Sequence, residues 1–104
     1  MQGIGGALFE ECLYDDAGLM QNGSMADYLV PMAGEMPDIT VAHVQTPTAS
    51  SKLGAKGAGE AGTAGAPAAV MNAINDALAP MDVAVFSQPC TPEKILVALG
   101  KVVI

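Results

Sequence analysis

The stretch Pro67-Ala-Ala-Val-Met-Asn-Ala-Ile-Asn-Asp-Ala-Leu78 has the pattern of an amphipathic helix. Proline is favoured in the first helical turn, and Pro80 cannot continue a helix, so both boundaries are marked. The spacing predicts a helix over about 67–78. Its apolar stripe consists of Val70, Ala73, Ile74, Ala77 and Leu78.

A second helix is predicted over about 92–99. Thr91 is a favoured N-cap residue, proline suits the position after it, and Glu93 places a negative charge at the positive end of the helix. Gly100 is a typical C-terminal stop. Between the two helices, residues 83–86 have the composition of a short strand.

The N-terminal half adds a short helix and a strand. Residues 2–11 can form a helix, and the glycines in it indicate that something packs close to its backbone. The β-branched run Ile39–Gln45 is the best strand candidate in the chain. We therefore expect an α+β fold, with short helices packed on a small sheet, and a single segment over residues 1–104.

Charge and composition exclude several classes of function. The chain has 4 basic and 11 acidic residues, a net charge of −7, and no arginine, which argues against nucleic acid and anionic membranes as partners. No apolar run approaches the roughly 20 residues of a membrane span. Only 14% of residues are charged, where about 25% is usual. Such a composition indicates a piece embedded in a larger assembly.

The two cysteines, Cys12 and Cys90, have neither CxxC nor metal-ligand spacing. We interpret them as free thiols in a reducing compartment, and we predict no metal site built by side chains of this chain. A disulfide or a shared metal is the alternative.

The glycine-rich loop Gly54-Ala-Lys-Gly-Ala-Gly-Glu-Ala-Gly62 is the strongest candidate for chemistry. Glycines let a backbone approach a bulky ligand, and a carboxylate in a water-poor pocket can act as a general base. The simpler interpretation is a flexible surface loop with a solvated glutamate. The loop also matches the Gly-x-Gly-x-x-Gly dinucleotide fingerprint, but residues 48–52 are not the apolar strand that this motif requires.

Four motifs occur in order along the chain: Gln2-Gly-Ile-Gly-Gly-Ala-Leu-Phe-Glu-Glu11, Asp27-Tyr-Leu29 with Pro31, Leu53-Gly-Ala-Lys-Gly-Ala-Gly-Glu60, and Gly65-Ala-Pro-Ala-Ala-Val-Met-Asn-Ala-Ile-Asn-Asp-Ala-Leu78. Together they closely resemble the C-terminal end of the large subunit of molybdenum hydroxylases, the xanthine oxidase family. The sequence is most similar to the aerobic carbon-monoxide-dehydrogenase-like branch. The resemblance runs from Gln2 to about Leu99.

The resemblance implies that this chain is the C-terminal portion of a molybdopterin-binding domain, with a cofactor loop over about 52–66. In that family the cofactor is molybdenum–molybdopterin, a cytosine dinucleotide form in most bacterial members. Glu60 would be the active-site base in the hydroxylation of an aldehyde, N-heterocycle or similar small molecule. Gln2 would hydrogen-bond the pterin or a metal oxygen. Backbone groups would line the cofactor at Lys56, Gly57, Ala58 and Gly59.

The resemblance also implies partners, because a complete large subunit is several times longer than 104 residues. We expect the remaining large-subunit polypeptide, an iron–sulfur subunit with its clusters and a subunit carrying FAD, all in the cytoplasm. The chain would then be a split subunit or a truncated product, and an oxidoreductase only within that complex. The competing hypothesis is a non-catalytic structural fragment without a cofactor.

Overall fold

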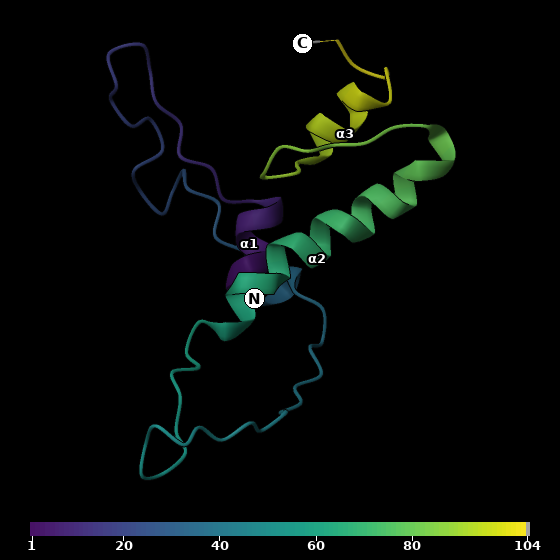
Figure 1. Ribbon diagram of the computed structural model, residues 1–104. Helices are drawn as coiled ribbons and strands as arrows, with labels where there is room; N and C mark the ends of the chain where they lie inside the picture. The colour runs from purple at the N-terminus through teal and green to yellow at the C-terminus, as the bar shows by residue number, and fades with distance from the viewer. Residues whose placement is uncertain (104) are drawn as a thin grey trace.

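The computed structural model describes residues 1–103, and its regular structure is helical (Figure 1). The long helix α2 crosses the middle of the molecule, α1 packs at its N-terminal end, and α3 lies along its C-terminal half. Long loops leave this helical unit on both sides. The elements are α1 (Gln2–Leu8), η1 (Ala33–Glu35), α2 (Ala61–Leu78), η2 (Ala79–Met81) and α3 (Pro92–Ala98).

The crossing of α1 and α2 depends on the absence of a side chain at Gly3. A Cβ atom there would lie 2.7 Å from the Cβ of Ala66 and 2.9 Å from Cδ of Pro67. No larger residue fits without a shift of one helix, since real Cβ atoms do not approach so closely. The expectation that something packs against the backbone of residues 2–11 is therefore confirmed.

Helix α2 begins at Ala61, six residues before the expected start at 67. Pro67 therefore lies inside the helix and not in its first turn. Proline in a helix interior removes the hydrogen bond to the carbonyl four residues earlier, here that of Thr63. The ring of Pro67 packs against α1 at Gly3. The local sequence pattern predicts neither this tertiary contact nor the earlier start of the helix.

A small apolar core joins the second half of α2 to α3. Its buried members are Met71, Leu78, Val85 and Cys90. Asn75 holds the neighbouring segment by two hydrogen bonds: its Nδ2 donates to the carbonyl oxygen of Val85 (3.0 Å) and its Oδ1 accepts from the Val85 N–H (2.9 Å). The segment expected to be a strand at 83–86 is thus anchored by a side chain and not by a neighbouring strand.

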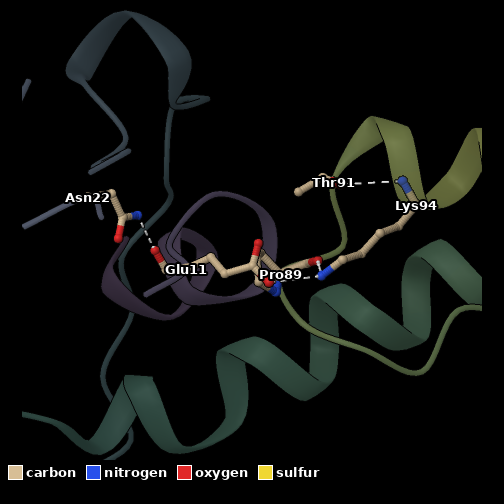
Figure 2. Close-up of polar contacts among 5 residues, drawn as sticks. All are labelled: Glu11, Asn22, Pro89, Thr91 and Lys94. Carbon is tan, nitrogen blue, oxygen red and sulfur yellow. Dashed lines mark hydrogen bonds and ion pairs between the residues drawn. The ribbon is translucent and has the colours of Figure 1, made fainter. Parts of the chain in front are cut away.

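A polar network ties the exit of α1 to α3 (Figure 2). Asn22 donates from Nδ2 to the carbonyl oxygen of Glu11 (2.6 Å), and Lys94 donates from Nζ to the Pro89 carbonyl (2.9 Å) and to Glu11 Oε1 (3.4 Å). Thr91 caps α3 by accepting from the Lys94 N–H (3.3 Å). The Lys94–Glu11 pair is partly exposed, so the backbone contacts are the firmer part of this link.

Helix α3 ends as its sequence predicts, with a left-handed glycine. Gly100 has φ +65°, and the N–H groups of Gly100 and Lys101 donate to the carbonyls of Val97 and Leu96. These two bonds form a Schellman motif, which satisfies carbonyls at the end of the helix. The helix covers its expected range to within one residue.

The expected small sheet is not present in residues 1–103, so that part of the α+β expectation is wrong for this chain. The structure has one isolated antiparallel bridge, between Tyr14 and Met20. A strand is stable only when a neighbour satisfies its backbone groups. The best candidate, residues 39–45, is exposed along its whole length and has no such neighbour in the described part of the chain.

The chain is more extended than a compact domain of its length. Its radius of gyration is 17.8 Å, whereas a compact domain of this length has about 13 Å. Large apolar side chains are exposed over much of its length. Within residues 1–103, no helix is both long enough and apolar enough to cross a membrane.

We predict that Gly3→Ala separates α1 from α2, because the new methyl group would overlap Ala66 and Pro67. The free energy of unfolding, measured by urea titration with circular dichroism, should fall by about 1–3 kcal/mol. Gly6→Ala in the same helix is the matched control, since nothing lies within 4 Å of its Cβ position. The control should be neutral or stabilising by up to about 1 kcal/mol. Equal effects of the two changes would contradict this account.

We also predict that Asn75→Ala loosens the segment after α2, because the Val85 backbone loses both of its side-chain partners. The same urea titration should show a loss of about 1–3 kcal/mol. Asn72→Ala, on an exposed position of the same helix, should change stability by less than about 0.5 kcal/mol. If Asn72→Ala lowered the free energy of unfolding as much as Asn75→Ala, the two hydrogen bonds between Asn75 and Val85 would not be what stabilises this segment.

Candidate functional site

The N-terminal ends of α1 and α2 meet beside a hollow of about 490 Å³. The α1 side contributes Gln2 and Gly3, and the α2 side contributes Gly59, Gly62 and Thr63. The polar side-chain groups on its wall are the amide of Gln2 and the hydroxyl of Thr63. The helix crossing thus brings together two of the expected site residues, Gln2 and Gly59, that are far apart in the sequence.

Gln2 and Thr63 contact each other across this hollow. Thr63 Oγ1 donates to Gln2 Oε1 at 3.5 Å, at the long end of hydrogen-bond geometry. Because the amide oxygen faces the hydroxyl, the amide NH₂ group remains as a donor for a ligand. Sequence reasoning missed Thr63, because the region up to residue 66 was expected to be loop. With the helix start placed at Ala61, Thr63 lies in the first turn, three residues after Glu60. That position is the signal that would have identified Thr63 as a candidate site residue.

Glu60 is the N-cap residue of α2 and lies between two residues that line the hollow, Gly59 and Gly62. Its carbonyl oxygen accepts from the Thr63 N–H at 3.0 Å, and its side chain makes no capping hydrogen bond. The carboxylate is exposed, so this chain does not itself supply the water-poor pocket expected around it. Exclusion of water from Glu60 requires other groups to cover it.

Lys56 and Ala58 line a different hollow, of about 370 Å³. The ammonium of Lys56 donates to Thr46 Oγ1 at 2.6 Å, which joins the two sides of the loop. The structure therefore divides the expected cofactor residues between two hollows, with Gln2 and Gly59 on one and Lys56 and Ala58 on the other. Gly57 lies between Lys56 and Ala58 in the sequence. No strand precedes it in the described chain, so the strand that a dinucleotide fingerprint requires is absent there.

Three glycines of this region, Gly57, Gly59 and Gly62, meet no structural requirement within the described chain. At Gly57, Gly59 and Gly62 a Cβ atom would meet nothing within 4 Å, and none of the three has a positive φ. Gly54 is different, because its φ is +68° and a Cβ there would lie 2.9 Å from Cβ of Pro47. The open backbone from 57 to 62 therefore has room for a large group that approaches closely.

The Asp27-Tyr-Leu29 motif has a structural part beside α1. Tyr28 Oη donates to Glu10 Oε2 at 2.9 Å, and this hydrogen bond, together with burial and the negative charge of Glu10, raises the pKa of Tyr28. The phenol therefore stays a neutral donor. A Cβ at Gly5 would collide with the same Glu10 carboxylate and with the ring of Pro31, so Gly5 is required where this loop packs on α1.

Neither cysteine is engaged. Cys12 is exposed and Cys90 is buried, and both are free thiols. Over residues 1–103, no group of three or more His, Cys, Asp or Glu side chains is arranged to hold a metal ion.

Comparison with known proteins identifies the family. A model described as a molybdopterin cofactor-binding domain matches residues 1–37. The large subunit of nicotine 6-hydroxylase from Paenarthrobacter nicotinovorans is 44% identical over 92% of this chain and 12% of its own length. The molybdenum-binding subunit of an aldehyde oxidoreductase from Escherichia coli K12 is 39% identical over 97% of this chain and 14% of its own.

Two crystal structures share the backbone arrangement. Quinoline 2-oxidoreductase from Pseudomonas putida 86 superposes with a TM-score of 0.88 and 42% identity, over 96% of this chain and 13% of that one. The Cu,Mo-CO dehydrogenase superposes with a TM-score of 0.78 and 31% identity, over 93% of this chain and 13% of that one.

The two relatives cover 92% and 97% of this chain, and these sequence matches agree with the structural superpositions. The chain spans only 12 to 14% of the length of these relatives. Within that length, it belongs to the xanthine oxidase family of molybdenum-binding large subunits.

Proposed function

We propose that this chain is the C-terminal part of a molybdenum hydroxylase large subunit and supplies the active-site base, Glu60. The observation that carries the proposal is the helix crossing at Gly3. It places the Gln2 amide on the same hollow as Gly59, directly beside Glu60 in the sequence. Gln2 and Gly59 are far apart in the sequence but line the same hollow, and this arrangement supports a role for the neighbouring Glu60.

The residues around the hollow fit a molybdenum–pterin group. The backbone at Gly57, Gly59 and Gly62 leaves space that a Cβ would otherwise fill, so a bulky group can approach the N–H groups there. Gln2 would hold the group through its free amide NH₂, and Lys56 and Ala58 would form a second part of the wall. The cytosine dinucleotide form is part of this proposal.

The chemistry follows from these positions. The bound molybdenum–pterin group would supply the oxygen-transfer and electron-accepting chemistry of a hydroxylase. Glu60 would accept a proton at its carboxylate when the substrate carbon is hydroxylated, a role that needs a nearby reacting group and little water. The hydrogen bond from Thr63 to Gln2 would orient the Gln2 amide so that its NH₂ group can donate to the cofactor.

The substrate class is proposed from the relatives' names, which specify nicotine, quinoline and aldehydes as substrates. We infer an aldehyde, an N-heterocycle or a similar small molecule. The partners would be the remaining large-subunit polypeptide, an iron–sulfur subunit and an FAD subunit, in the cytoplasm. A structural fragment without a cofactor is the competing proposal, and it predicts that the chain never co-purifies with molybdenum.

We predict that Glu60→Gln in the assembled enzyme lowers kcat by about 10²–10⁴-fold, the usual contribution of a general base. The amide cannot take up the proton, but its size is unchanged, so the molybdenum content should be retained. Turnover of an aldehyde and an N-heterocycle, with metal analysis of the same sample, measures both quantities. Glu93→Gln, at an exposed position in α3, is the control and should be active. Near-normal turnover of Glu60→Gln would exclude Glu60 as the base.

A second change tests the cofactor contact. Gln2→Leu removes the amide donor at similar size. Affinity for the molybdenum cofactor should fall by about 5–100-fold, as expected for the loss of one hydrogen bond to a buried group. The molybdenum retained after dialysis measures this loss. Gln21→Leu, on the exposed loop after α1, is the control and should retain the metal. Equal retention in the two variants would contradict the role of Gln2.

A further inference from the structure

The wide loop before α2 closes on itself at its tip. In Figure 1 the teal chain turns back near the bottom of the view and forms a small closed turn there. The N–H of Thr48 donates to the carbonyl oxygen of Gly54 (3.1 Å), and the Gly54 N–H donates to the carbonyl oxygen of Ser51 (3.1 Å). Gly54 has φ +68°, a backbone conformation that glycine adopts without strain. Residues 48–54 are therefore a turn held by its own backbone.

A side-chain hydrogen bond closes this turn at its base. Lys56 donates from Nζ to Thr46 Oγ1 at 2.6 Å, between residues ten positions apart in the sequence. Such a short distance suits a charged donor. Both residues lie outside the range 48–54, so their bond encloses the backbone bonds of the turn. We call this Thr46–Lys56 hydrogen bond the clasp.

The clasp lies at the start of the open glycine backbone. Gly57 follows Lys56 directly, and α2 begins at Ala61. Residues 57–60 are thus the short link between the clasp and the first turn of α2. A link of four residues spans at most about 14 Å, so the place of the clasp limits the places that Glu60 can take.

Lys56 is also the basic residue nearest to Glu60 in the sequence. The dinucleotide form of the proposed cofactor carries phosphates, and an ammonium can bind a phosphate as a point charge. Lys56 could therefore act as a charge contact for the cofactor or as a tie within the loop. Its ammonium is bonded to Thr46, and Lys56 lines the hollow of about 370 Å³ and not the one beside Gln2. These observations favour the tie.

We propose that Lys56 is a positioning residue, whose ammonium holds Thr46 and thereby fixes the end of the loop from which residues 57–60 leave. The charge of Lys56 does not contact the cofactor, and only its backbone belongs to the wall. This inference rests on the proposed function in taking the molybdenum–pterin group as the ligand of the glycine backbone. The clasp itself is a property of this chain, whatever that backbone binds.

The first test is amide hydrogen exchange in the assembled enzyme carrying Thr46→Val. Valine keeps the shape of threonine but lacks the hydroxyl, so the clasp cannot form. Exchange of the Thr48 and Gly54 amides should be faster by about 3–10-fold, as expected for the loss of one exposed hydrogen bond to a charged group. Thr46→Ser keeps a hydroxyl and should exchange as the unchanged enzyme does. Unchanged exchange in Thr46→Val would overturn the proposal.

The second test distinguishes a tie from a charge contact by the molybdenum that the assembled enzyme retains after dialysis. Lys56→Met and Thr46→Val remove the same bond, so each should weaken cofactor binding by about 3–10-fold. The double variant should lose no more than either single variant, because the bond can be lost only once. Lys52→Met removes a charge from an exposed position of the same loop and should retain molybdenum fully.

Three results of this second test would contradict the proposal. A much larger loss for Lys56→Met than for Thr46→Val would show that the ammonium itself contacts the cofactor. Additive losses in the double variant, or an equal loss for Lys52→Met, would show that the clasp is not the cause. The proposed function fails separately: if Glu60→Gln turns over normally while Thr46→Val and Lys56→Met behave as expected, the base assignment is wrong and Lys56 remains a positioning residue.

Discussion

The rest of the structure depends on the contact between the backbone of α1 and the side chains of Ala66 and Pro67 on α2. Because Gly3 has no Cβ, the two helices approach closely, and their N-terminal ends open onto one hollow. The same contact positions Gln2 against Thr63. Any displacement of α1 would move the Gln2 amide away from the glycine loop, so a steric detail of helix packing also determines the geometry of the candidate site.

Two groups of glycines in this chain differ in what surrounds them. Gly3 and Gly5 are required because neighbouring atoms of the chain occupy the space of a Cβ. Gly57, Gly59 and Gly62 have empty space around them and ordinary backbone angles, so no contact within the described residues requires glycine there. The low charge, the extended shape and the exposed apolar side chains all suit the proposed contact with more polypeptide or with a cofactor.

Local signals predicted those parts of the fold that are determined locally. The cap at Thr91 and the left-handed Gly100 lie within the residues that they terminate, and α3 has nearly its expected range. The start of α2 was misplaced because Pro67 was interpreted from local preference, whereas its ring belongs to a tertiary contact. The sheet was wrongly expected because a strand needs a partner that pattern alone cannot supply. For the site, Glu60 and Gln2 were proposed from motif resemblance, and only the structure revealed Thr63.

The exposure of Glu60 makes the proposed catalysis conditional on assembly. A general base acts on a reacting group that is held next to it and shielded from water. In this chain the exposed Glu60 stands at the N-terminal end of α2, and its side chain makes no capping hydrogen bond. Other groups must therefore close over the open end of α2 before Glu60 can act as proposed, so base catalysis and the covering of this helix end are linked.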